Sequence, residues 1–152
     1  MREEQWLATL MYEIWDSKFP DVKKKNNIVI RWKGHWKNKF GHIRTLKNKD
    51  TEIGINNLFK DPMVPEYVIH LTIAHEIIHY MHGFHSPYPR MFKHPHKGGI
   101  VNKELKKRGF LEDIKKEKFW TKTYWPKVYT ELLNPKEPGK IWTHKIKKFN
   151  FF

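Results

Sequence analysis

The sequence predicts one α+β domain in which helices pack on a small sheet. Three observations support this fold class: an amphipathic helical pattern near the N-terminus, three short β-type runs between residues 28 and 56, and a longer apolar helical segment over residues 65–82. A length of 152 residues suits one domain with a single core, and the sequence has no internal repeat.

The first predicted helix covers residues 3–19. Its apolar side chains recur at offsets 0, 1, 4, 5, 8 and 9, which places them on one face of a helix. Pro20 follows Phe19 and marks the end of the segment. The apolar residues are Trp6, Leu7, Leu10, Met11, Ile14 and Trp15.

Three strands are expected next, and together they would form a small sheet. Residues 28–32 are rich in β-branched side chains, and residues 36–46 form a weaker strand interrupted by Gly41. Residues 51–56 alternate apolar and polar side chains, which is typical of a half-buried strand. We expect this third strand to border the binding cleft, with an open edge that could pair with an extended peptide.

A second helix is predicted over residues 65–82, with a proline in its first turn and Gly83 at its end. Its apolar residues cover much of the circumference, as in a central helix. A proline-containing loop follows, and another helix is predicted over residues 99–108, ending at Gly109.

Beyond Lys118 the pattern becomes irregular, because aromatic residues are scattered among prolines and lysines. We expect one or two short strands or an ordered tail lying on the domain. The predicted organisation is therefore a main domain at 1–118 and a basic, aromatic-rich extension at 119–152. A further hypothesis is that this extension covers the cleft. The aromatic residues that define it are Trp120, Tyr124, Trp125, Tyr129, Trp142, Phe149, Phe151 and Phe152.

The composition excludes several classes of site. The chain has no cysteine, so any metal must be held by histidine and carboxylate rather than by thiolates. No apolar run approaches the roughly 20 residues of a membrane span, and the N-terminus lacks the apolar stretch of a signal peptide. We therefore expect a cytoplasmic protein without membrane contact.

The chain is strongly basic, with 30 Lys and Arg against 16 Asp and Glu and a formal net charge of +14. Such a charge attracts polyanions, so nucleic acid is the expected partner. The alternative is a lysine-rich solvated surface without a partner, as thermophilic proteins often have.

Residues 75–79 read HEIIH, the HExxH pattern, inside the predicted apolar helix. Residues four apart lie on one face of a helix, so His75 and His79 can bind a single Zn²⁺. Glu76 would lie beside the remaining coordination position and act as general base on a water whose pKa the metal lowers. Seven of the ten histidines lie between His70 and His96, which also favours a metal site over isolated structural histidines.

The third metal ligand is open among four residues. His96 and His94 lie in the loop that enters the helix predicted at 99–108, and His96 is favoured. His85 has the spacing of a metzincin third ligand, although the glycine of that pattern is displaced by one position. Glu104 would give a site with two histidines and one glutamate. His82 shares the face of His75 and His79, so it would not approach the metal from a new direction.

The stretch TIAHEIIH at residues 72–79, together with PHKG at residues 95–98, resembles the SprT-like zinc metallopeptidases. This resemblance covers about residues 51–110 and implies a zincin-type core in which His96 takes the place of the family's third ligand. The minigluzincins have a similar core and use glutamate, which would correspond to Glu104. Members of the SprT-like family include proteases that digest proteins crosslinked to DNA. Many carry a cysteine zinc ribbon, which this chain lacks.

These observations predict a zinc-dependent endopeptidase that hydrolyses peptide bonds through a metal-activated water and acts on DNA-associated proteins. The first alternative is a basic nucleic-acid-binding module with a structural zinc site. A second is a zinc hydrolase with another substrate, because HExxH specifies the activated water and not its target.

Overall fold

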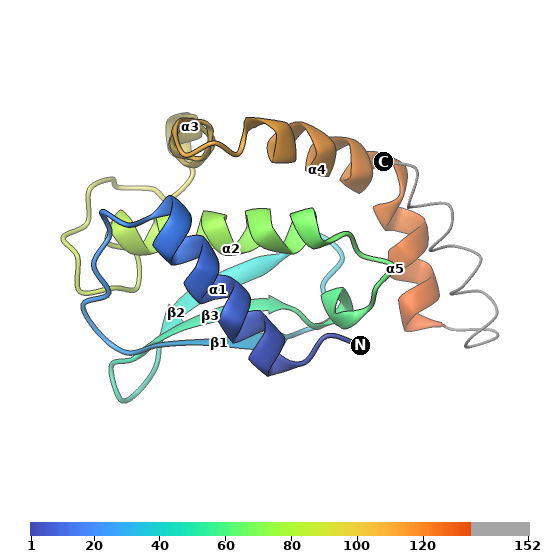
Figure 1. Cartoon of the computed structure of the whole chain (residues 1–152), viewed down its shortest axis with the longest axis horizontal. Helices are drawn as coiled ribbons and strands as arrows, with labels where there is room; N and C mark the ends of the chain where they lie inside the picture. Colours follow the sequence, from blue (N-terminus) through green and yellow to red (C-terminus); the bar gives the residue numbers. More distant parts are fainter. Residues whose placement is uncertain (135–152) are drawn as a thin grey trace.

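Helix α2 (Glu66–Met81) is the central element of the structure, which is a computed structural model describing residues 1–134. Eleven of its sixteen residues are buried, and such a helix must be covered on several sides. Helix α1 (Glu4–Lys18) and the sheet lie against it on one side. Helices α3 (Ile100–Lys107) and α4 (Leu111–Thr123) lie on the other (Figure 1).

The sheet has three strands in the order β1-β3-β2, so β3 (Thr51–Asn56) is central. It pairs in parallel with β1 (Ile28–Lys33) and antiparallel with β2 (Gly41–Thr45). Because β3 is central, β1 and β2 are the edge strands of this sheet. The expectation that the strand at 51–56 has an open edge is therefore wrong. The edge strand that contacts α2 is β2.

All six residues of β3 are buried, so the expectation of a half-buried strand is also wrong. Alternation in the sequence correctly separates the two faces of the strand, but it says nothing of its neighbours. Ile53 and Ile55 point into the core, while Glu52 is covered on the opposite face by long basic side chains of β1 and β2.

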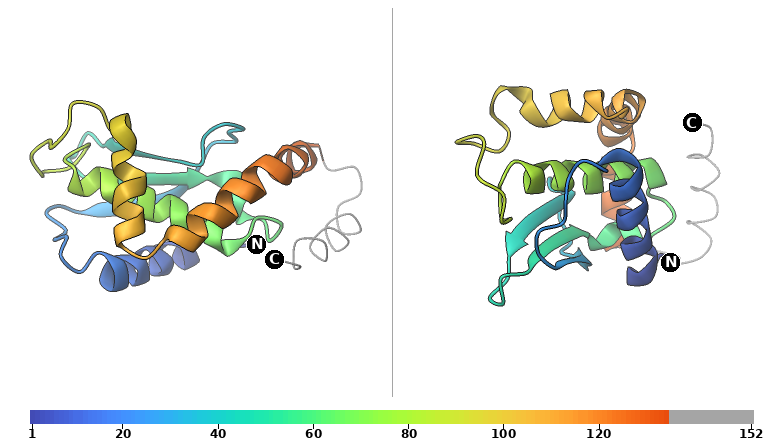
Figure 2. Two further views of the ribbon diagram at one scale, coloured as in Figure 1. Left: turned by 90° about the horizontal axis from the view of Figure 1, so that it is seen from above. Right: turned by 60° about the vertical axis from the view of Figure 1, so that its left-hand side comes forward.

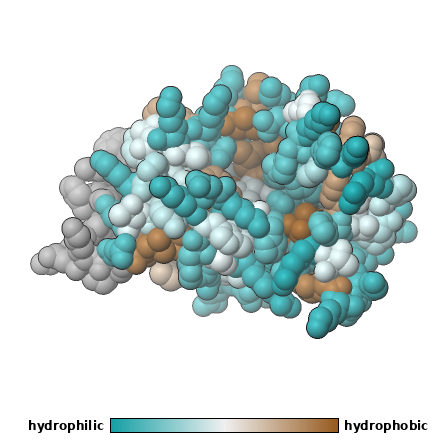
Figure 3. Space-filling view, turned by 180° about the vertical axis from the view of Figure 1, so that it is seen from behind, coloured by the Kyte–Doolittle hydropathy of each residue, from teal (hydrophilic) through white to brown (hydrophobic). Residues whose placement is uncertain are grey.

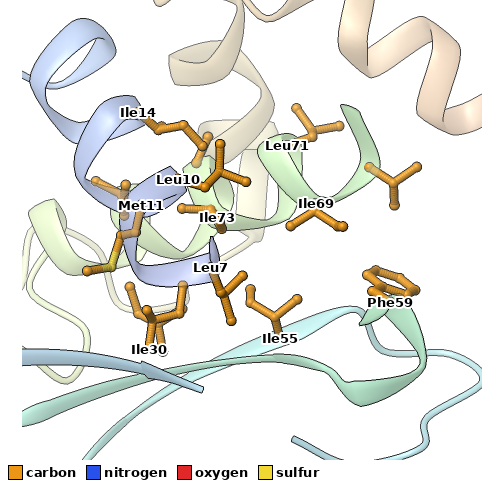
Figure 4. Close-up of a cluster of buried hydrophobic side chains, with 14 of the residues drawn as sticks. Leu7, Leu10, Met11, Ile14, Ile30, Ile55, Phe59, Ile69, Leu71 and Ile73 are labelled. Atoms are coloured by element: carbon orange, nitrogen blue, oxygen red, sulfur yellow. The ribbon is translucent and has the colours of Figure 1, made fainter. Parts of the chain in front are cut away.

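The core lies between the sheet and the two helices α1 and α2. Ile30 and Ile55 rise from the sheet toward Leu7 of α1 and toward Ile69 and Ile73 of α2 (Figure 4). Each of these side chains is at most 7% exposed. This packing fixes the rotation of α2 about its axis and hence the direction in which its histidines point.

The segment after α3 differs from the strands or tail expected there, because it forms helices α4 and α5 (Trp125–Leu133). Helix α4 continues through position 118 without a break. Trp120 is fully buried, and the Trp120 and Trp125 rings pack with Phe40 at centroid distances of 5.5 to 6.5 Å. The helical period was obscured because polar side chains occupy part of the inner face of α4. The predictions for Trp142 and the three terminal phenylalanines lie outside the described residues.

The other predicted helices and the strand at 28–32 are confirmed to within one residue at their ends. The strand predicted at 36–46 is shorter, and Gly41 begins it instead of interrupting it. Short 3₁₀ turns precede α2 and α3, at Asn57–Lys60 and Lys97–Gly99. Within residues 1–134, no helix is long and apolar enough to span a membrane.

The outer face of the sheet carries a buried carboxylate beneath basic residues. No helix of the described part covers this face, as the two views of Figure 2 show. Glu52 is nevertheless inaccessible to solvent, because basic side chains cover its carboxylate. Arg44 Nε lies 2.7 Å from Oε1. Side-chain nitrogens of three further residues lie 3.3 to 3.7 Å from the carboxylate oxygens: Arg31, Lys33 and His42. Burial alone would raise the pKa of Glu52. Hydrogen bonds from Arg44 and His42 and the charge of Lys33 outweigh that effect and leave the pKa below its usual 4.5.

This arrangement predicts a pH dependence of stability. Because the folded-state pKa of Glu52 is lowered, its contribution to the free energy of unfolding is complete above about pH 4.5. That contribution is lost as the pH falls through the folded-state pKa. Urea unfolding at several pH values should show a smaller acid-induced loss in Glu52→Gln than in the wild type. Glu13→Gln, at an exposed position of α1, is the control. Equal acid sensitivity of wild type and Glu52→Gln would contradict the prediction.

Candidate metal centre

Helix α2 places His75 and His79 one turn apart on the same face. Their ring centroids are 4.7 Å apart, and His79 is buried whereas His75 is partly accessible. The pair therefore lies where the core meets the surface, as expected for residues four apart on a helix whose other faces are packed.

His96 completes a cluster of three imidazoles. Its Nε2 lies 3.1 Å from Nε2 of His75 and 3.0 Å from Nε2 of His79. Ligand atoms of the three residues all lie within 4.8 Å of one another, so the cluster could hold a metal ion. Nitrogen ligands about 2.0–2.1 Å from a tetrahedral Zn²⁺ are about 3.3 Å apart, and the two distances from His96 fall within about 0.3 Å of that separation.

The loop after α2 brings His96 back to the helix. The His82 carbonyl accepts a hydrogen bond from the Met91 N–H at 2.9 Å, which holds the returning chain against the end of α2. Two and three residues after His96, Gly98 and Gly99 have φ angles of 77° and 65°. These left-handed conformations favour glycine and let the chain turn at once into α3.

The environment keeps the two α2 imidazoles neutral at physiological pH. Burial, reinforced by the neighbouring His96, lowers the pKa of His75 to about 4. Burial and the surrounding histidines lower the pKa of His79 to about 3. Because a histidine binds metal through an unprotonated nitrogen, protons would not compete with a metal ion at neutral pH.

Glu76 lies beside this cluster and is only 4% exposed. Burial raises the pKa of its carboxyl group to about 8, against a small opposing effect of the Lys39 charge. The sheet comes close to Glu76 at Gly41, where a Cβ atom would lie 2.7 Å from Thr72 Cγ2 and 3.5 Å from Glu76 Cγ. Glycine at this position therefore lets β2 pass next to the glutamate.

The other predicted ligand candidates lie outside the cluster. Glu104 forms an ion pair with Arg108 at 2.9 Å, and His94 is exposed in the loop. His85 borders the site, but it is exposed, and its carbonyl accepts a hydrogen bond from Thr51. His82 is buried against Phe92 with a ring distance of 4.9 Å, which agrees with its expected place away from the metal.

A groove runs past the cluster on both sides. A compartment of about 800 Å³ lies toward α3, α4 and α5, and a smaller one of about 260 Å³ lies toward Phe84 and His85. Both are lined by Gly41, His75, Glu76 and His96. Seen from the side of β2, hydrophobic surface lies in a hollow between hydrophilic side chains (Figure 3). An extended chain could thus pass both the edge of β2 and the histidine cluster.

Sequence reasoning missed two residues in the walls of this groove, Glu117 and Thr121 of α4, which line the larger compartment. Trp125, at the start of α5, lines it too and belongs to the aromatic segment that was expected near the cleft. On a helix over residues 111–123, Glu117 and Thr121 lie on one face. The lysines in this segment weaken the helical periodicity of apolar residues, so the sequence pattern does not indicate a helix there. Gly41 was noted only as an interruption of a strand.

Comparison of this chain with protein families, curated proteins and solved structures found no match.

If His96 belongs to the metal centre, His96→Ala should lower zinc affinity by roughly 100-fold or more, since it removes one of three ligands. Competition with a chromogenic chelator measures this affinity. His94→Ala, two residues away and exposed, is the matched control and should bind zinc as the wild type does. A larger loss of affinity in Glu104→Ala or His85→Ala than in His96→Ala would contradict this assignment.

Proposed function

We propose that the chain is a zinc-dependent endopeptidase of the SprT-like type. One observation carries the proposal: three converging imidazoles and a buried glutamate lie together where two groove compartments, of about 800 and 260 Å³, meet. Structural zinc sites are closed, four-ligand sites, whereas catalytic sites use three protein ligands and keep one position open.

The donor set favours zinc. Histidine nitrogen is a common zinc ligand, and the chain offers no thiolate. His75, His79 and His96 would hold the ion. When bound, Zn²⁺ supplies a lowered water pKa and polarisation of the substrate carbonyl.

Glu76 would perform the proton transfers of hydrolysis. Its carboxylate takes a proton from water as the water oxygen bonds to the amide carbon, and it then gives that proton to the amide nitrogen as the C–N bond breaks. Burial raises the pKa of this carboxyl group to about 8, so it can both accept and release a proton close to that pH.

Substrate would be aligned by β2. One edge of β2 pairs with β3, and the other edge pairs with no strand of the described residues. The residues of β2 that line the smaller compartment are Gly41, His42 and Ile43. An extended peptide pairing with this edge would gain backbone hydrogen bonds with little dependence on side chains. The role expected for residues 51–56 thus passes to the neighbouring strand.

Glu76→Gln tests the peptidase proposal. We expect kcat/KM for peptide hydrolysis to fall by about 10³-fold or more, because the general base is lost. Bound zinc and the urea unfolding curve should stay as in the wild type. Glu66→Gln, an exposed position of the same helix, is the control and should retain activity. A wild-type protein that binds zinc and cleaves no peptide would instead support a structural zinc site.

Nucleic acid is proposed as a partner, in line with the net charge of +14. The outer face of the sheet supports this, since the side chains of Arg31 and Arg44 are 49% and 50% exposed on a surface that no described helix covers. Both guanidinium groups lie near Glu52, with Arg31 Nη1 at 3.7 Å and Arg44 Nε at 2.7 Å from its carboxylate oxygens. Phosphate groups could bind there.

The double variant Arg31→Gln/Arg44→Gln should weaken DNA binding and reduce the slope of log Kd against log salt by about 1–2, as two phosphate contacts are lost. Fluorescence anisotropy at several salt concentrations measures both. Lys103→Gln/Lys107→Gln removes the same charge from exposed positions of α3. An equal loss of affinity in both double variants would mean that binding depends on total charge and not on this face.

A further inference from the structure

The larger compartment of the groove has mainly apolar walls. Phe40, Leu71, Leu105, Ile114 and Trp125 contribute apolar side chains, and the compartment volume is about 800 Å³. It adjoins His75 and Glu76, so a side chain placed there would belong to a residue next to the bond under attack. Its chemistry therefore bears on which substrates fit.

Glu117 introduces a carboxylate into this apolar wall. It lies in the middle of the inner face of α4, between Ile114 and Trp120, where the pattern of an amphipathic helix would place an apolar residue. Glu117 and Glu76 are the two carboxylates among the described residues that line the compartment.

The carboxylate has a hydrogen bond but no cationic partner among the described residues. Thr121 Oγ1 donates to Glu117 Oε1 at 2.9 Å, and no lysine or arginine within residues 1–134 lies within 4.0 Å of it. Lys37 and Lys118 line the same compartment, but both are exposed. Burial raises the pKa of Glu117, which means that the charged form is not compensated by the protein itself.

An uncompensated carboxylate at the wall of an apolar compartment is a site for a cation. The aliphatic stem of a lysine or arginine can lie against Leu71, Leu105 and Ile114 while its charged end reaches the carboxylate. Aliphatic walls alone would accept a leucine or norleucine side chain equally well. The carboxylate is the feature that would favour a lysine or arginine side chain over these uncharged ones.

We propose that Glu117 is a specificity-determining residue that selects peptides with lysine or arginine in the larger compartment, directly beside the scissile bond. The proposal rests on the proposed peptidase function and names the substrate class of that site. It holds although the chain as a whole is basic, because the interaction is a short-range one inside the groove.

The test compares two peptides that differ only in a charge. Quenched fluorescent peptides of one sequence carry either lysine or norleucine at each position flanking the scissile bond. We expect the ratio of kcat/KM for lysine over norleucine to be about 10 or more in the wild type, as for a buried hydrogen bond to a charged group. Glu117→Gln should bring the ratio near one, and Glu117→Asp, which keeps the charge, should retain part of the preference.

Glu112→Gln is the matched control, because Glu112 is on the outer face of the same helix and its side chain is 74% exposed. This variant should keep the wild-type ratio. A wild-type ratio near one, or an unchanged ratio in Glu117→Gln, would overturn the inference. Urea unfolding of each variant separates an effect on specificity from a loss of folded protein.

The two proposals can fail separately. If the wild type cleaves neither peptide, the peptidase proposal fails, and the inference is then decided by calorimetric binding of the same peptides to the zinc-loaded full chain. Tighter binding of the lysine peptide that is lost in Glu117→Gln would support the cation site. Equal affinity of the two peptides would overturn it.

Discussion

The burial of α2 is the constraint on which the rest of the structure depends. A helix with apolar residues around most of its circumference must be covered by the sheet, by α1 and by α3 and α4. This packing leaves one stretch of the helix surface next to a groove, and His75 and His79 lie there. The packing of α2 against the core sets the direction in which these two histidines point, and both also contact His96, so the candidate metal site should be as rigid as the core beneath it.

The pKa of a buried carboxyl group depends on the groups around it, as two glutamates of this chain show. Glu76 is buried beside imidazoles, and its pKa rises to about 8 although the charge of Lys39 acts in the opposite direction. Glu52 is also inaccessible to solvent, but basic side chains cover it and its pKa falls. One environment produces a group that can exchange protons near neutral pH, and the other produces a fixed charge that organises a basic surface.

The groove results from two features that are far apart in the sequence. On one side β2 presents an edge that no strand within residues 1–134 pairs with, and the absence of a side chain at Gly41 allows β2 to pass close to Glu76. On the other side, α4 and α5 form the wall of the larger compartment and contribute Glu117 and Trp125. A catalytic centre on α2 would thus receive its substrate from β2 and its selectivity from the C-terminal helices.

The sequence by itself determined the local features: the helix at residues 65–82, the positions of the three strands, and the pairing of His75 and His79 with Glu76 between them. These follow from the period of apolar residues and from the geometry of one helical turn, which act over short distances in the chain. Only the tertiary structure decided that β3 is central, that His96 and not His85 or Glu104 joins the histidine pair, and that Glu117 faces the groove. These outcomes depend on which elements pack together and how loops close, and a local pattern of side chains does not encode either.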